Sequence, residues 1–154
     1  MHPKIAEFPS KTFYDGKLLN GISERDRTLP PLPWPNPKVP CMFIHVSSQE
    51  MVSVHNSKSN PKEVEVLIDV LRNLQIEKGF EWKDVGILSA YSAQVKLIRK
   101  SLRSVNLLDP YLTIQTIDGF QGREKEIIIF STVRSNKQKK VSAKKTLNYL
   151  FFSC

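Results

Sequence analysis

Four short apolar runs constrain the fold of this chain more than any other feature of its sequence. They occupy residues 42–46, 85–88, 112–117 and 127–130. Each run is continuous and most are rich in β-branched side chains, which is typical of strands in a parallel sheet covered on both faces. Helical patterns separate the runs, and this alternation predicts an α/β fold with right-handed crossovers.

The first helical pattern lies between the first two apolar runs. Asn60 can cap the helix, Pro61 suits its first turn, and Glu63 completes a capping box. Apolar residues recur at helical spacing, and Gly79 ends the pattern. These apolar residues are Val64, Leu67, Ile68, Leu71 and Leu74.

A second helix is predicted to begin near Ser92, directly after the second apolar run. Its apolar stripe is interleaved with cations, namely Lys96, Arg99, Lys100 and Arg103. Cations on a helix usually indicate a solvated face, and a nucleic-acid contact is the alternative.

Composition places the chain among globular proteins of one domain, with 154 residues and 40% hydrophobic residues. The net charge is +8, and five of these charges are lysines in residues 137–154, which contain no acid. Net charge alone is therefore weak evidence for a nucleic-acid partner. Residues 28–40 hold six prolines, which predicts an extended surface loop.

Several classes of protein are disfavoured by the sequence. Cys41 and Cys154 cannot make a disulfide framework, and the three histidines lack metal-ligand spacing, so we expect no metal site. No apolar run approaches the roughly 20 residues that span a bilayer. We therefore expect no membrane contact and an intracellular protein, in the nucleus or the cytoplasm.

Residues 116–124 join the last two apolar runs and are the most informative stretch. Two glycines, Gly119 and Gly122, permit tight turning and close approach of a ligand to the backbone. Connections at the carboxyl ends of parallel strands commonly bind phosphates and nucleotides. Glu124 can accept a hydrogen bond from a ribose hydroxyl, and Thr116 can donate one to a phosphate. A simple tight turn is the alternative.

The complete string resembles motif V of superfamily 1 helicases of the up-frameshift and senataxin type. Residues 116–124 read Thr-Ile-Asp-Gly-Phe-Gln-Gly-Arg-Glu, against the family's Thr-Val-Asp-x-Phe-Gln-Gly-x-Glu, and residues 133–136 read Val-Arg-Ser-Asn. Met-His-Pro at residues 1–3 is similar to motif IV. Residues 86–94 are similar to the family's Gly-Ile-Ile-Thr-Pro-Tyr-x-x-Gln. Three motifs in the family's order make the resemblance specific.

The resemblance implies a motor of two RecA-like lobes, with ATP between them and single-stranded RNA or DNA across the top. We expect residues 1–136 to form the second lobe, an incomplete RecA-like parallel sheet flanked by helices, from motif IV to motif V. Residues 137–154 are expected to be a divergent lysine-rich tail. The partners would be the nucleic acid and a missing first lobe.

The same resemblance assigns roles to individual residues. It implies that ATP, with Mg²⁺ when a first lobe is supplied, is bound by Gly122, Arg123 and Glu124. It implies nucleic-acid contacts from Thr116, Tyr91 and Ser89. It implies coupling between the two sites by Asp118, Gln121 and Arg134. Simple loop capping is an equal alternative for the first two of these, and a packed rim tyrosine is the alternative for Tyr91.

The sequence also departs from the family. It has no P-loop string, no Asp-Glu magnesium pair and no motif VI arginine, whose loss typically costs about a thousandfold in rate. We therefore expect no ATP hydrolysis or unwinding by this chain alone. We also expect the last strand to be missing, which would leave an exposed sheet edge, unless the apolar residues within 147–152 cover it. Truncation of a longer helicase, a non-enzymatic module that binds nucleic acid or a helicase, and a poorly folded remnant are three competing interpretations.

Overall fold

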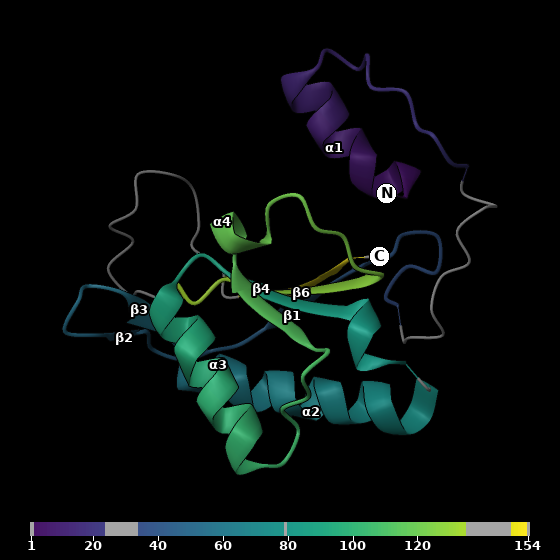
Figure 1. Cartoon of the computed structure of the whole chain (residues 1–154). Helices are drawn as coiled ribbons and strands as arrows, with labels where there is room; N and C mark the ends of the chain where they lie inside the picture. Colours follow the sequence, from purple (N-terminus) through teal and green to yellow (C-terminus); the bar gives the residue numbers. More distant parts are fainter. Residues whose placement is uncertain (1, 24–33, 79, 135–148, 154) are drawn as a thin grey trace.

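A computed structural model of the chain describes residues 2–23, 34–78, 80–134 and 149–153 (Figure 1). The elements, in chain order, are α1 (Pro3–Phe13), β1 (Cys41–His45), β2 (Met51–Val52), β3 (Lys58–Ser59), α2 (Pro61–Lys78), η1 (Trp82–Asp84), β4 (Val85–Ser89), α3 (Ser92–Ser104), β5 (Thr113–Thr116), α4 (Ile117–Phe120), β6 (Ile127–Ser131) and β7 (Tyr149–Ser153). The four strands predicted from apolar runs are confirmed as β1, β4, β5 and β6.

The main sheet has the strand order β1-β7-β6-β4-β5. β4 pairs in parallel with β5 on one side and with β6 on the other, so the predicted parallel sheet is confirmed for these three strands. β7 is antiparallel to both of its neighbours, β6 and β1. β1 therefore runs in the same direction as β4, β5 and β6, although it pairs with none of them.

β7 changes the interpretation of residues 137–154 as a tail. The strand pairs with β6 through four residues and with β1 through five, so β6 does not form the exposed edge that the sequence predicted. The alternative, in which residues from 147–152 cover that edge, is confirmed for the backbone of residues 150–152. Reversing the chain is enough to place an antiparallel strand beside β6, whereas a parallel strand needs a crossover. The lysine-rich stretch 137–145 lies outside the described residues.

The two faces of the sheet are covered differently. Figure 1 shows α2 and α3 together on one face and α4 on the other. In β6, Ile127 and Ile129 are fully buried, whereas Ile128 and Phe130 on the opposite face are only half-buried. The predicted sheet flanked by helices is therefore confirmed, although the α4 face is less completely covered than the face of α2 and α3. α4 has four residues and cannot cover five strands.

The connection from α4 to β6 lies directly on this less covered face. A Cβ atom on Gly86 would meet the Lys125 Cγ atom at 3.1 Å and the Phe120 ring at 3.5 Å. Gly86 therefore lets the connection approach the sheet closely, and the glycine is fixed by this approach rather than by a turn.

The predicted start of α2 is partly confirmed. The Asn60 side-chain oxygen accepts a hydrogen bond from the Glu63 backbone N–H at 3.2 Å, as an N-cap should. The capping box is wrong, because the Asn60 N–H donates to the Gln94 side chain at 2.8 Å instead of to Glu63. The carboxylate of Glu63 is thereby released for a tertiary contact.

Within the described ranges, no helix has the length and apolar character that crossing a membrane requires.

Candidate nucleic-acid and nucleotide sites

The carboxyl ends of three parallel strands form one edge of the sheet. In the strand register, Ser89 at the end of β4 lies opposite Thr116 of β5 and Ser131 of β6. The segments that follow these strands therefore start side by side. This carboxyl edge is the usual ligand-binding edge of an open α/β sheet.

Thr116 is held in place by the short helix that it caps. Its hydroxyl oxygen accepts a hydrogen bond from the Gly119 N–H at 3.2 Å, which leaves the hydroxyl proton able to donate. A side chain at position 119 would crowd this bond, because a Cβ atom there would lie 3.2 Å from the Thr116 oxygen. Thr116 is half-buried, so a ligand at the carboxyl edge can reach it.

Ser89 is not placed as the sequence predicted. The residue is fully buried, and its hydroxyl donates to the Ser131 carbonyl at 3.0 Å. The same oxygen accepts a hydrogen bond from the Tyr91 N–H at 3.4 Å. Ser89 therefore positions the backbone before α3, and its side chain does not face a ligand.

Tyr91 and Arg134 come together at the carboxyl edge. A hydrogen bond from the guanidinium to the Tyr91 side chain raises the pKa of Arg134, and Glu50 adds to the shift. Arg134 Nε donates to a Glu50 carboxylate oxygen at 3.0 Å. The other oxygen of Glu50 accepts from the ammonium group of Lys58, at 2.5 Å. Arg134 is thus linked both to the stacking candidate and to the β2–β3 hairpin.

A buried polar cluster supports this edge from inside. Glu63 is fully buried, and one of its carboxylate oxygens accepts from the Ser131 hydroxyl at 2.5 Å and from the Val133 N–H at 3.1 Å. Gln94 donates to the Ser131 hydroxyl oxygen at 2.9 Å. Burial raises the pKa of Glu63, against the smaller opposing effect of the two donors.

The cluster also fixes an unusual backbone conformation. Val133 has a φ of +67°, which a β-branched residue rarely adopts, and its N–H and carbonyl are both hydrogen-bonded, to Glu63 and Asn60. Arg134 follows directly and is aimed by this turn. Sequence reasoning missed Glu63 and Gln94 as supporting residues. The sequence signal that could have found them is their position: each polar side chain stands next to the apolar stripe of its helix, on the side that faces the core.

The nucleotide candidates lie elsewhere. Gly122, Arg123 and Glu124 belong to the connection that crosses the sheet face, and all three are exposed. Gly122 has a φ of +78°, and nothing lies within 4 Å of where its Cβ would be, so its backbone is open to a ligand. Glu124 lines a hollow of about 200 Å³ near the amino end of β4. The other lining residues are Lys83, Asp84, Lys125 and Glu126. The structure therefore separates Glu124 from the carboxyl edge.

The fit of ATP to this hollow is partial. The exposed Glu124 carboxylate can accept hydrogen bonds from ribose hydroxyls. The hollow is lined by three carboxylates against two lysines, so its net charge is negative and phosphates fit better outside it, toward Gly122 and Arg123. Among the described residues there is no cluster of three histidine, cysteine, aspartate or glutamate side chains that could hold a metal ion.

Asp118 lies within α4, and Gln121 directly follows its last residue. Both are exposed, and the Gln121 N–H donates to the Asp118 carbonyl at 3.3 Å. Neither side chain hydrogen-bonds to another described residue, so the structure gives no support to loop capping by these side chains. They remain available to groups outside the chain.

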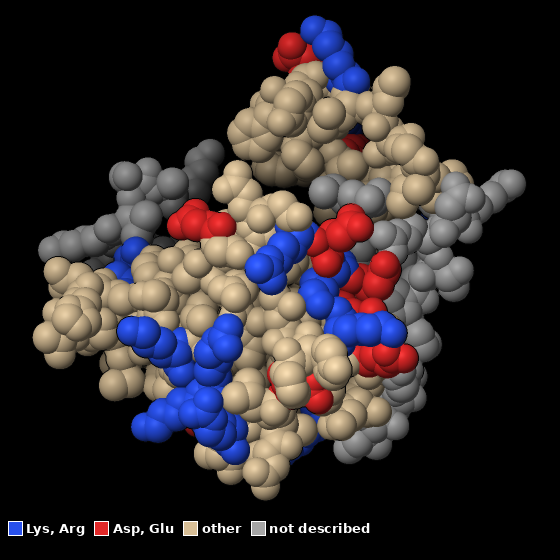
Figure 2. All heavy atoms as spheres, viewed as in Figure 1, with Lys and Arg blue, Asp and Glu red and all other residues tan. Residues whose placement is uncertain are grey.

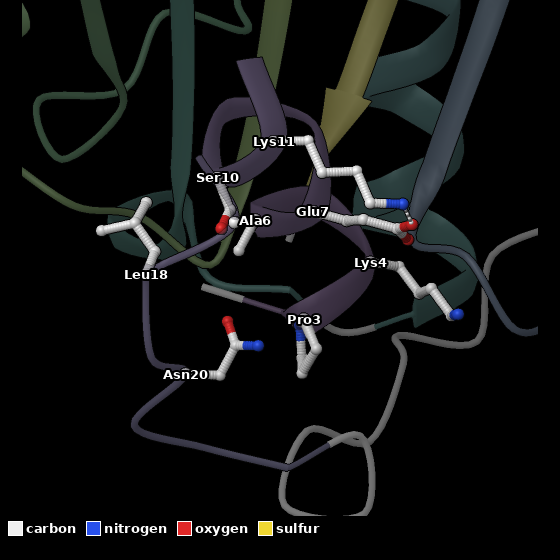
Figure 3. A pocket seen from close by; sticks show the side chains of 9 residues that line it. Pro3, Lys4, Ala6, Glu7, Ser10, Lys11, Leu18 and Asn20 are labelled. Carbon is white, nitrogen blue, oxygen red and sulfur yellow. Dashed lines mark hydrogen bonds and ion pairs between the residues drawn. The ribbon is translucent and has the colours of Figure 1, made fainter. Parts of the chain in front are cut away.

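A further hollow of about 320 Å³ lies beside α1 (Figure 3). Its lining residues are Pro3, Lys4, Ala6, Glu7, Ser10, Lys11, Gly16, Leu18 and Asn20. Lys11 pairs with Glu7 at 2.5 Å on its rim. None of the predicted site residues lines this hollow, so it adds nothing to either candidate site.

Comparisons with known proteins agree with the motif order. Residues 1–149 match a family model described as an AAA domain. The chain is 34% identical over 142 residues to regulator of nonsense transcripts 1 of Caenorhabditis elegans, which covers 88% of this chain and 13% of that protein. It is 33% identical over 148 residues to the ATP-dependent helicase NAM7 of Saccharomyces cerevisiae, covering 92% of this chain and 15% of the relative. It is 34% identical over 151 residues to the 5'-3' DNA helicase ZGRF1 of Mus musculus, covering 96% and 8%. The chain thus spans only a small part of these relatives.

Proposed function

Because this chain belongs to the up-frameshift type of superfamily 1 helicases, whose AAA domain it matches over residues 1–149, we propose that it acts as the second motor lobe of an ATP-dependent helicase. In this proposal the carboxyl edge binds single-stranded RNA or DNA, and Glu124 with its neighbours contributes to the ATP cleft. The first lobe supplies the P-loop and the magnesium site.

The observation that carries the proposal is the grouping of Thr116, Tyr91 and Arg134 at the carboxyl edge. A half-buried tyrosine can stack on a base, a threonine hydroxyl can donate to a phosphate, and a guanidinium adds positive charge. These contacts depend on the backbone and on any base face, so they do not distinguish RNA from DNA.

The test compares Tyr91→Ala with Tyr111→Ala in fluorescence-polarisation titrations of a labelled oligouridylate. Tyr111 is 72% exposed and precedes β5 at the opposite edge, so it is a matched control. Loss of one stacking contact costs about 1–3 kcal/mol, so Tyr91→Ala should weaken binding roughly 5- to 150-fold. Tyr91→Phe should keep most of the affinity, because its ring can still stack. Equal affinities for wild type, Tyr91→Ala and Tyr111→Ala would refute this assignment.

The isolated chain should not hydrolyse ATP. A second variant, Glu124→Ala, provides the background for this measurement, with single-stranded RNA present in both reactions. We expect phosphate release to be equal in the two samples, because the groups that activate water and stabilise the transferred phosphoryl belong to parts of the motor that this sequence does not contain. Turnover that requires Glu124 would overturn this part of the proposal.

A further inference from the structure

The outer face of α3 carries a cluster of cations with no acidic residue in the helix. Gln94, Ile98 and Leu102 face inward and are buried. Lys96, Arg99, Lys100 and Arg103 are exposed on the outer side. Figure 2 shows lysine and arginine side chains gathered at the lower left, over the position of α3 in Figure 1.

Most other exposed lysines in the described ranges form ion pairs with acidic residues, whereas the cations of α3 do not. Lys11, Lys17 and Lys62 each form an ion pair with an acidic residue close in sequence, namely Glu7, Asp15 and Glu65. Within the described ranges no ion pair involves the cations of α3. One of them, Arg99, donates to the Ile114 carbonyl at 2.5 Å and is held against β5.

The other three cations form a row along the helix. Lys96, Lys100 and Arg103 stand at positions i, i+4 and i+7, so they share one face over about 10 Å of helix. Like charges at this spacing disfavour the helix, and the helix dipole compensates only near its carboxyl end, at Arg103. A bound polyanion would relieve this repulsion along the whole row.

The position of α3 indicates which polyanion fits. The helix begins one residue after Tyr91, so its outer face leads away from the carboxyl edge. The row offers single charges at intervals and no aromatic side chain, which suits a phosphate backbone and gives nothing for base recognition.

We infer that the outer face of α3 is a second, sequence-independent contact for single-stranded nucleic acid, along which a strand held at Tyr91 continues. The inference rests on the proposed function, since that function places the strand at the carboxyl edge. The contact lengthens the binding site without adding base specificity.

The experiment measures oligouridylates of about 5 and about 15 nucleotides, lengths within the range of single-strand binding sites, against KCl from about 50 to 200 mM. The test variant is K96Q/K100Q/R103Q, and the control is K11Q/K17Q/K62Q, which removes the same charge from paired lysines. For the longer strand we expect the test variant to bind about tenfold or more weakly at the lowest salt. The slope of log binding constant against log KCl concentration should be less steep by about 2, which is roughly 0.7 for each of the three lost phosphate contacts. The control should resemble the wild type, and the shorter strand should be little affected by either variant.

Equal salt dependence in the test and control variants would overturn the inference. Displacement of the longer strand by polyglutamate at an equal concentration of charge would also overturn the inference. It would indicate that the outer face of α3 binds an acidic protein instead. The effect of Tyr91→Ala on binding of the shorter strand tests the proposed function alone. A failure of the proposed function can therefore be told apart from a failure of this inference. Circular dichroism checks folding, and K96Q/R103Q against K11Q/K62Q gives the same comparison should the triple variant not fold.

Discussion

Replacing Glu63 by glutamine should change how the stability of the protein depends on pH. Glu63 is fully buried, with two hydrogen bonds to one carboxylate oxygen and none to the other among the described residues. Burial in these surroundings raises the pKa of the carboxyl group in the folded protein above its ordinary value near 4.5. Glutamine has the same shape but does not titrate.

The sign of the effect follows from proton binding. Between the ordinary pKa and the raised pKa, the folded protein holds a proton at Glu63 that the unfolded chain has released. The stabilising contribution of this group is therefore complete below the unfolded pKa and is lost as pH rises through the folded pKa. Each pH unit within that window lowers the free energy of unfolding by up to about 1.4 kcal/mol.

The glutamine variant also carries a cost that does not depend on pH. Its amide group replaces the carboxylate oxygen that lacks a partner, and an unsatisfied buried donor costs about 1–3 kcal/mol. We therefore expect wild type to be the more stable protein near the ordinary pKa of the carboxyl group. The difference should shrink or reverse toward neutral pH.

Urea and thermal unfolding of both proteins from acid to neutral pH would measure this difference. A change of 1 kcal/mol corresponds to about 2–4 °C in Tm for a chain of this size. The control is Glu65→Gln, since Glu65 is exposed on the same helix and pairs with Lys62. A difference between wild type and Glu63→Gln that stays constant with pH, or grows in favour of wild type as pH rises, would refute the reasoning.

Three more outcomes can be checked. Gly122→Ala should cost about 1 kcal/mol in urea unfolding, because alanine is strained at a φ of +78° although space is free; an unchanged midpoint would contradict this. Phe151→Pro should destabilise the sheet by about 3 kcal/mol or more, because proline breaks the pairing of a central strand. The backbone amides of residues 41–45 should then lose their protection from hydrogen exchange. Retained protection of these amides would refute the observed strand order. Replacing the lysines of residues 137–145 by glutamine should weaken RNA binding only moderately under the helicase-lobe proposal. Abolished binding would favour the non-enzymatic module. Truncation after residue 136 would be a poor substitute, because it also removes β7.

Local sequence signals were enough for the central part of the fold. The apolar runs predicted β1, β4, β5 and β6, and the Asn60 cap placed the start of α2, because these features depend on neighbours in sequence. The sequence did not predict α1. Its start is capped by the His2 ring nitrogen, which accepts from the Lys4 N–H at 3.2 Å, and histidine is not a common cap.

Features that depend on distant residues were predicted less well. The capping box at Glu63 was a reasonable expectation from spacing, but Gln94 competes for the same backbone N–H from another helix. The family resemblance implied a nucleic-acid contact for Ser89, yet its hydroxyl donates to the Ser131 carbonyl of β6. The separation of Glu124 from Thr116 follows from the path of the connection across Gly86, which no local pattern records.

The strand order has a consequence for how the protein forms during synthesis. β4, β5 and β6 can pair as soon as residues 85–131 have left the ribosome, since their partners are close in sequence. β1 leaves much earlier, yet its only partner in the main sheet is β7, which is made near the end of the described chain. The backbone groups of β1 must therefore stay without this partner, in water or with a chaperone, until residues 149–153 have been made. Slow synthesis before residue 149 should lengthen this exposed period and increase aggregation.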